Sequence, residues 1–222
     1  KPKVSAFTSA KLDKIAALKP DLVLGFSDLQ ADIAADLVRR GIEVHVFNHR
    51  SVADIFRMIA MLGGMLGVEA KTRTLIAELE AGLEKLRKAA ARLPRHPRVY
   101  FEEWDEPQIS GIAWVSELVG VAGGVDVFPE LAKESLAKDR IVADPTEVIR
   151  RQPDIILGSW CGKKFRPKQV VARAGWEAVP AVRDGELHEI KSSIILQPGP
   201  AALTDGVNAI HKVIAEWAAK AR

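Results

Sequence analysis

The chain has 222 residues, of which 48% are hydrophobic and 27% are charged, and its formal net charge is +3. This length allows one large domain or two small ones, each with its own core. Acidic and basic residues are interspersed, so there is no polybasic arm and we expect no nucleic-acid partner. No apolar run approaches the roughly 20 residues of a membrane-spanning helix. The single cysteine, Cys161, excludes an internal disulfide.

The opening residues, KPKVSAFTSA, lack the apolar segment of a signal peptide, so we expect a mature or trimmed form. The first patterned segment follows at 12–26, LDKIAALKPDLVLGF, and predicts a short helix, a Pro-Asp break and a buried strand. Pro20 ends the helix, because its ring cannot donate the next backbone hydrogen bond. The apolar run before Gly25 is typical of a parallel strand that is covered on both faces.

Periodic apolar residues then predict a helix at 31–40, and alternating apolar residues predict a strand at 42–47. Ser51, with Asp54 three residues later, resembles a capping box that opens the next helix. The paired glycines at 63–64 are expected to break that helix.

The most regular pattern lies at 69–93, where leucines recur at helical spacing and charged residues occupy the other positions. Pro94 and Pro97 follow and end the predicted helix. At 1.5 Å per residue it spans roughly 35 Å, about the width of a small domain. We interpret it as a rod between two lobes; the alternative is a surface helix of a single α/β domain.

Beyond this helix, the patterns predict strands at 98–101 and 187–190 and helices at 114–121 and 200–217. The segment 145–160, PTEVIRRQPDIILGSW, repeats the order found at 12–26: a helix, a Pro-Asp break, an apolar strand and a glycine with an aromatic residue close behind. Two such units on either side of one long helix predict two similar α/β lobes. The predicted division is an N-terminal lobe at 1–66, a connecting helix at 67–94 and a C-terminal lobe at 95–222.

Ligands of open α/β sheets bind beyond the carboxyl ends of the strands, where the loops are free of the core. Aromatic residues make up only 6% of the chain, yet Phe26, Trp104 and Trp160 each follow a predicted strand. Together they predict a stacking surface for a large, flat, partly apolar ligand. The alternative for each ring is packing beneath a loop, and Trp114, at a helix start, is a further candidate for which core packing is the commoner outcome.

Polar residues at the same strand ends form weaker candidates. Ser27 follows the first strand, and Cys161 follows the second repeat strand. Because the sequence has no second cysteine and no histidine at metal-ligand spacing, we expect no metal site. Four carboxylates follow the predicted strand at 98–101: Glu102, Glu103, Asp105 and Glu106. They could act as acid and base or bind a cation, but such an acidic cluster more commonly lies in a solvated loop. Four basic residues follow the second repeat strand: Lys163, Lys164, Arg166 and Lys168. They could contact an anion, although such a run generally lies on the solvent-exposed surface.

Common catalytic motifs, including phosphate loops and nucleophile elbows, do not occur in the sequence. The lobe pattern and the segments KPDLVLGF, QPDIILGSW, ISGIAWVSELVGVAGGVDVF and LQPGPAALTDGV resemble the class III substrate-binding proteins of ABC importers. This resemblance covers nearly the whole chain and is strongest toward the vitamin B12-binding members, with siderophore and haem binders close behind. It implies two Rossmann-like α/β lobes with a ligand cleft between them, a corrinoid ligand such as cobalamin, an ABC permease as partner, a monomer and a periplasmic or cell-surface location. It implies neither an enzyme nor a cofactor.

The resemblance also implies roles for particular residues. Phe26 matches the aromatic residue that follows the first-lobe strand in B12-binding members, and Trp104 and Trp160 are candidates for the rest of the clamp. Asp32 and Glu147 loosely match the acidic residue at the tip of each lobe that pairs with permease arginines. The remaining candidates on the ligand side are Ser27, Glu103, Trp114, Cys161 and Gln197.

Family members normally begin with a further strand, helix and loop, so we expect the first lobe to be incomplete here. Two other interpretations stay open. One is an enzyme, since chelatases and sugar transferases also have two α/β lobes around a cleft. The other is an intracellular corrinoid sensor or carrier that works without a transporter.

Overall fold

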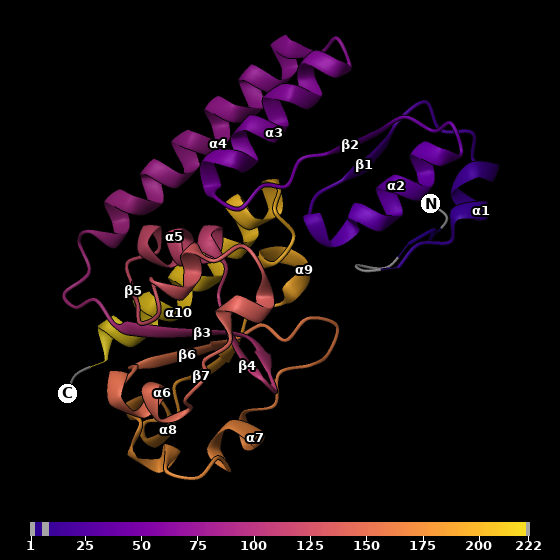
Figure 1. Ribbon diagram of the computed structural model, residues 1–222. Helices are drawn as coiled ribbons and strands as arrows, with labels where there is room; N and C mark the ends of the chain where they lie inside the picture. Colours follow the sequence, from indigo (N-terminus) through magenta and orange to yellow (C-terminus); the bar gives the residue numbers. More distant parts are fainter. Residues whose placement is uncertain (1–2, 6–8, 221–222) are drawn as a thin grey trace. The chain divides into compact units, whose positions relative to one another are not determined.

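The computed structural model describes residues 3–5 and 9–220. It divides the chain into two compact units, Lys1–His49 and Arg50–Arg222 (Figure 1). Both units combine helices with parallel strands, which confirms the predicted α/β class. The division into lobes at 1–66 and 95–222 with a connecting helix stays a prediction.

The first unit contains a two-stranded parallel sheet, in which Val23 lies opposite Val44. Its elements are α1 (Leu12–Ala17), β1 (Val23–Gly25), the short helix η1 (Asp28–Gln30), α2 (Ala31–Arg39) and β2 (Val44–Val46). Leu37 of α2 and Ile15 of α1 are buried, but Leu24 of β1 is 47% exposed. The prediction that this strand is covered on both faces is therefore wrong, because the face on which Leu24 lies stays open to solvent among the described residues.

The second unit is built on a five-stranded sheet of order β4-β3-β6-β7, with β5 beside the start of β3. The strands are β3 (Arg98–Asp105), β4 (Gln108–Ser110), β5 (Val125–Asp126), β6 (Ile155–Gly158) and β7 (Leu187–Glu189). The longer helices are α3 (Val52–Met65), α4 (Glu69–Ala90), α5 (Ala113–Val121) and α10 (Val207–Ala219). The shorter ones are η2 (Leu131–Lys133), η3 (Ala137–Arg140), α6 (Thr146–Arg151), α7 (Pro167–Val171), η4 (Trp176–Ala178), α8 (Pro180–Arg183), α9 (Ser192–Ile195) and the π-helix η5 (Ala202–Gly206).

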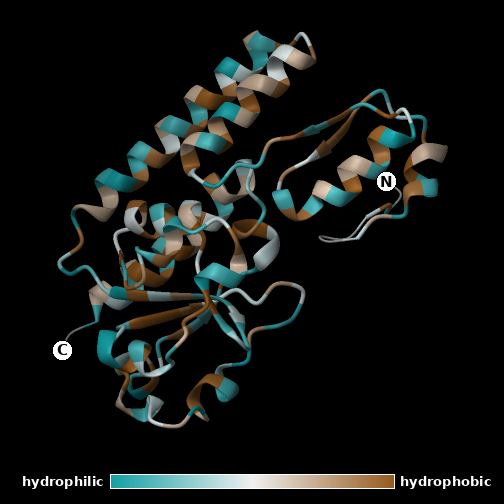
Figure 2. Ribbon diagram, viewed as in Figure 1, coloured by the Kyte–Doolittle hydropathy of each residue, from teal (hydrophilic) through white to brown (hydrophobic). Residues whose placement is uncertain are grey.

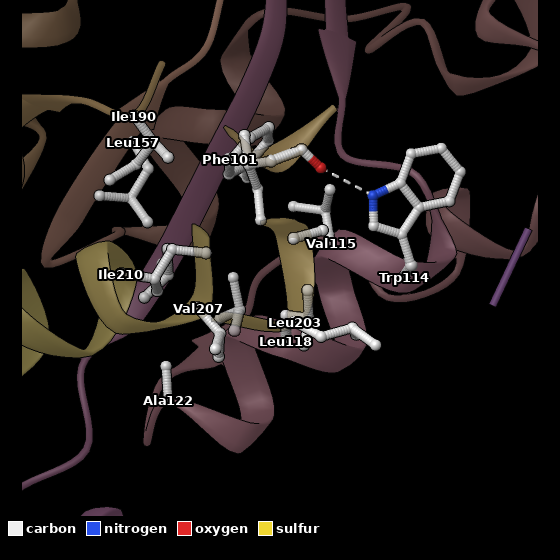
Figure 3. Packing of buried hydrophobic residues seen from close by; sticks show 14 of the residues in the cluster. Phe101, Trp114, Val115, Leu118, Ala122, Leu157, Ile190, Leu203, Val207 and Ile210 are labelled. Atoms are coloured by element: carbon white, nitrogen blue, oxygen red, sulfur yellow. Dashed lines mark hydrogen bonds between the residues drawn. The ribbon is translucent and has the colours of Figure 1, made fainter. Parts of the chain in front are cut away.

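Side chains of β3 and β6 alternate between two separate cores on opposite faces of the sheet. Phe101 and Leu157 belong to the core that contains α4, α5 and α10, part of which is drawn in Figure 3. Tyr100 and Ile156 belong to the core beneath α6, α7 and α8. Strands buried on both faces read as continuous apolar runs, which is why 155–157 could be predicted as one.

The long helix α4 begins at the predicted residue and ends three residues early, since a turn follows Ala90. Its buried side chains are Leu79, Leu83, Leu86 and Ala90, and the three leucines join the core of the second unit. Figure 2 shows hydrophobic and hydrophilic residues alternating around it. The capping box of α3 is present, because Ser51 and Asp54 bond reciprocally to backbone N–H groups.

Gly63 lies inside α3 and does not break it, contrary to the prediction. A Cβ at Gly63 would stand 2.2 Å from Oγ1 of Thr72 on α4, so the missing side chain permits the two helices to pack closely. The helix ends instead at Met65, and Gly67 follows in the left-handed region with φ 63°. Gly63 thus serves helix packing rather than termination, whereas a Cβ at Gly64 would meet no atom within 4 Å.

The internal repeat extends to the backbone. Lys19 and Gln152, the residues before Pro20 and Pro153, both adopt left-handed conformations, with φ of 47° and 46°. Because proline disfavours the α region for the residue that precedes it, each helix ends at that point. The two Pro-Asp breaks therefore share a backbone conformation as well as a sequence pattern.

Candidate functional site

The parallel strands of the second unit end side by side. Glu102 of β3 lies opposite Gly158 of β6, which in turn lies opposite Glu189 of β7. Residues that follow these positions therefore gather at one edge of the sheet, the edge at which α/β proteins bind ligands. Four of the predicted site residues lie on these two strand ends: Glu103, Trp104, Trp160 and Cys161.

The carboxylate of Glu102 is buried and fully paired. Arg173 donates two hydrogen bonds to it, at 2.6 and 3.0 Å, and the indole N–H of Trp160 donates a third at 2.9 Å. Burial raises the pKa of Glu102, while the Arg173 guanidinium opposes that shift. The interpretation of this carboxylate as part of a solvated loop is therefore wrong, because Arg173 and Trp160 replace its water.

Trp160 is 2% exposed and meets the ring of Phe165 edge-on, with 5.0 Å between the ring centroids. This packing requires Gly158, since a Cβ there would lie 1.9 Å from the Phe165 ring. We predicted Trp160 as an open stacking surface for the ligand. In the structure both its ring and its N–H are occupied, so it acts as a packed support beneath the strand ends.

Glu103 is paired in the same way with a different arginine. The guanidinium of Arg140, only 2% exposed, donates to both Glu103 oxygens at 2.9 and 3.1 Å. Burial raises the pKa of Glu103, and Arg140 opposes the shift. Arg140 also donates to the carbonyls of Ser110, Glu134 and Ser135, which fixes the loop around it. Glu103 thus anchors a loop and is not an isolated acid.

Trp104 differs from Trp160 in being only partly buried, at the end of β3. Its indole N–H donates to the carbonyl of Glu106 at 2.8 Å, which fixes the ring. The ammonium group of Lys163 lies 4.1 Å from the Trp104 ring centroid and 5.2 Å from that of Trp160, and it forms an ion pair with Asp105. Trp104 is therefore a positioned aromatic ring with one cation already resting on it.

A hollow of about 530 Å³ opens beside these residues, at the ends of β6 and β7. We call it the lysine hollow, because Lys163, Lys164 and Lys191 line it together with Trp160, Gly162, Glu189, Ile190, Ser192 and Ser193. Its volume falls in the range of small-molecule sites. Part of the basic run after the second repeat strand, Lys163 and Lys164, thus lines a cavity.

The other predicted residues of the second unit are not among those that line the lysine hollow. Trp114 is 3% exposed, lies in the core on the opposite face of the sheet from Trp160, and donates to the carbonyl of Ile195 at 2.8 Å (Figure 3). Gln197 is exposed after α9. Burial raises the pKa of the Cys161 thiol and the Glu103 carboxylate adds to that shift, so the thiol stays protonated and unreactive at neutral pH.

In the first unit, the strand ends also carry aromatic groups. Phe26 is half-buried, its backbone N–H is held by the Gln30 side chain at 2.9 Å, and its ring lies 6.3 Å from that of His49. Phe47, after β2, lies 6.2 Å from His49 on the same end of this sheet. Ser27 is buried and caps η1 by accepting the N–H of Leu29, so its hydroxyl oxygen already serves the backbone.

The two predicted docking acids differ in their surroundings. Asp32 is exposed in the first turn of α2. Glu147, in the first turn of α6, forms ion pairs with Arg150 at 2.5 Å and with Arg151 at 3.3 Å. Any arginine from a partner therefore has to compete with these two pairs at Glu147.

Within residues 3–5 and 9–220, no group of three or more His, Cys, Asp or Glu side chains is placed to hold a metal ion. Among the helices that the structure describes, none combines the length and apolar character needed to cross a bilayer.

The strand ends of the second unit thus hold a fixed aromatic ring and a hollow, and arginines pair with the carboxylates of Glu102 and Glu103. A family model described as Periplasmic binding protein matches residues 1–194. The chain therefore belongs to the Periplasmic binding protein family, which confirms the resemblance seen in the sequence.

Two relatives illustrate the similarity in sequence. The uncharacterized ABC transporter substrate-binding lipoprotein YvrC of Bacillus subtilis is 23% identical over 220 residues, which cover 93% of this chain and 65% of that protein. The vitamin B12-binding protein of Vibrio parahaemolyticus is 26% identical over 215 residues, which cover 95% of this chain and 73% of that protein. The chain thus spans less than two thirds of YvrC.

Two solved structures show the same fold. An ABC transporter substrate-binding protein from Listeria monocytogenes matches with a TM-score of 0.81 at 20% identity, covering 96% of this chain and 84% of that one. Staphylococcus aureus IsdE complexed with heme matches with a TM-score of 0.77 at 18% identity, covering 93% and 81%. These likenesses confirm the predicted fold and leave the ligand open.

Sequence reasoning missed Arg140 and Arg173, which have no local pattern around them. They lie 37 and 71 residues from the glutamates they bind. A sequence signal existed only for the glutamates, as carboxylates directly after a buried strand. Lys163 was noted as part of a basic run, but its position over Trp104 depends on the turn at Gly162, which has a positive φ of 78°.

Proposed function

We propose that the chain is the ligand-binding component of an ABC importer and that it binds a tetrapyrrole-sized ligand at the strand ends of the sheet in its second unit. The observation that carries this proposal is Trp104, a fixed and partly exposed ring beside the lysine hollow. Membership of the Periplasmic binding protein family supports the importer role. So does the similarity to YvrC, a substrate-binding lipoprotein of an ABC transporter.

A corrinoid such as cobalamin is the first candidate ligand. A large flat macrocycle suits a positioned aromatic ring such as Trp104. Phe26, half-buried after β1 of the first unit, stays a separate candidate for a ligand contact. The similarity to a vitamin B12-binding protein supports this choice. Haem is the second candidate, supported by the likeness to IsdE and by the lysines of the hollow; a ferric siderophore is the third.

The proposal is one of binding rather than catalysis. A general acid or base needs an available proton site near the substrate, but Glu102 and Glu103 of β3 are held by arginines and Asp105 is paired with Lys163. Glu102 is fully buried, and Glu103 is bound through both of its oxygens. The alternative functions are an enzyme and an intracellular corrinoid carrier that works without a transporter.

Delivery to a permease completes the proposed role. Asp32, whose side chain is exposed, would pair directly with a permease arginine. Glu147 would exchange its ion pair with Arg150 for one with a permease arginine. We propose a periplasmic or cell-surface location and a monomeric state, as the resemblance implies. Binding of the ligand-free or ligand-loaded chain to permease vesicles, compared between the native protein and its Asp32→Ala and Glu147→Ala variants, tests the docking assignment.

Titration with a panel of three ligands tests the proposed function. The purified chain is mixed with cyanocobalamin, hemin or ferrichrome, and binding is followed by tryptophan fluorescence and calorimetry. The proposal expects one-to-one binding of one macrocycle with Kd on the order of 1 μM or lower. Selective binding of ferrichrome would move the chain to the siderophore class, and binding of none of the three would contradict the proposed function.

A further inference from the structure

The lysine hollow carries more positive charge than its own carboxylates offset. Lys164 and Lys191 are exposed, and neither forms an ion pair with a residue that the structure describes. The third ammonium group, on Lys163, is already paired with Asp105 and rests on Trp104. Two lysines in the wall of the hollow therefore have no counter-ion among the described residues.

The one carboxylate in the wall of the hollow is engaged with the backbone. Glu189 accepts a hydrogen bond from the backbone N–H of Phe165 at 3.2 Å, so one of its carboxylate oxygens is engaged with the backbone. Ser192 and Ser193 add hydroxyl groups to the same wall, and hydroxyl and ammonium groups both donate hydrogen bonds to anionic oxygens. The chemistry of the wall thus favours an oxygen anion over a cation or an apolar group.

We propose that the lysine hollow binds an anionic oxygen group on the rim of the ligand, while the flat part of the ligand lies against Trp104. This inference rests on the proposed function and specifies its ligand as a macrocycle with an ionised side arm. Lys164 and Lys191 provide the attraction. Lys163, held by Asp105 at the border between the hollow and the ring, keeps the two parts of the site apart.

Two tetrapyrroles supply such an anion from different sources. Cyanocobalamin has a phosphodiester in its nucleotide arm, and hemin has two propionate carboxylates. Each has a counterpart without that anion: dicyanocobinamide lacks the nucleotide arm, and hemin dimethyl ester has no ionised propionate. If the chain binds cyanocobalamin more tightly than dicyanocobinamide, the hollow recognises the phosphodiester. If it binds hemin more tightly than hemin dimethyl ester, the hollow recognises the propionates.

The test compares the native chain with the Lys164→Ala/Lys191→Ala variant for all four macrocycles. A matched control, Lys71→Ala/Lys85→Ala, removes the same charge from exposed positions on α4. For one of the two pairs, we expect the native chain and the control to bind the anionic member roughly tenfold more tightly than its counterpart. In the hollow variant this preference should fall to about twofold or less, with binding of the neutral counterpart unchanged.

The outcomes separate the inference from the proposed function. If the native chain binds a macrocycle but the hollow variant keeps the full preference, or if no preference exists, the inference is overturned while the function stands. If the native chain binds none of the four, the function itself is contradicted and the inference falls with it. Circular dichroism and thermal unfolding of each variant show that a loss of affinity is not a loss of fold.

Discussion

The indole N–H of Trp160 donates a hydrogen bond of 2.9 Å to a carboxylate oxygen of Glu102, and both residues are buried. This bond joins the end of β6 to the end of β3. It places Trp160 in the framework of the site rather than on its surface. The first prediction follows from that position.

Replacing Trp160 should reduce stability more than ligand affinity. Trp160→Phe keeps most of the apolar contact with Phe165 but removes one donor to a buried carboxylate, and it should lower the free energy of unfolding by about 1 to 3 kcal/mol. Trp160→Ala also leaves a cavity and should cost about 3 to 5 kcal/mol. Guanidinium denaturation measures both values. A fully stable Trp160→Ala protein with weakened ligand binding would restore the interpretation of Trp160 as a ligand-stacking ring.

The pair of Glu102 and Arg173 should show strong coupling in a double-mutant cycle. Arg173→Met leaves a buried carboxylate without its cation and should lower the free energy of unfolding by about 3 to 5 kcal/mol. Glu102→Gln with Arg173→Met removes both charges, so the double variant should be more stable than the sum of the single effects allows. Additive effects in urea denaturation would show that the two side chains do not act as a pair.

How much of this could be predicted from sequence depended on the range of the interaction. The long helix, the strand at 155–158 and the capping box at Ser51 follow from local periodicity and local hydrogen bonds, and the structure contains all three. The burial of Glu102 and Trp160 depends on Arg173 and Phe165, whose side chains arrive from other parts of the fold. Polar neighbours in the sequence therefore suggested exposure where the structure has a packed core.

The hairpin of β3 and β4 was missed for a related reason. Its acidic residues suggested a solvated loop, but Glu102 lies opposite Ser110 and Asp105 opposite Gln108 across an antiparallel pair. Arginine partners remote in sequence neutralise the two glutamates, and with that charge compensated the segment can pair as strands. Trp104, which retains an exposed surface, belongs to this hairpin.

The capping box of α3 should make stability sensitive to acid. Burial tends to raise the pKa of Asp54, but backbone N–H groups of Arg50 and Ser51 and the Arg57 charge lower it, so the net pKa lies below the ordinary 3.8. A depressed folded-state pKa stabilises the protein above the unfolded pKa, and this contribution is lost as pH falls through the folded pKa.

Asp54→Asn should therefore lower the free energy of unfolding by about 1 kcal/mol at neutral pH. The difference from the native protein should shrink below pH 3.8, as both states of the native chain become protonated. Thermal unfolding of the two proteins from acidic to neutral pH measures this. Ser51→Ala is a useful control, since it removes the other half of the box without removing a titrating group. A constant difference across the pH range would contradict the role of the Asp54 charge.

The most direct test of the account asks whether Trp104 contacts the bound ligand. The native chain, Trp104→Ala and Trp104→Phe are titrated with the macrocycle that the native chain binds. Because Trp104 is partly exposed, the variants should unfold at nearly the native temperature. We predict a loss of affinity of about tenfold for Trp104→Ala, substantial recovery with Trp104→Phe, and reduced fluorescence quenching in both. Unchanged affinity and unchanged quenching in Trp104→Ala would contradict the placement of the ligand at the end of β3.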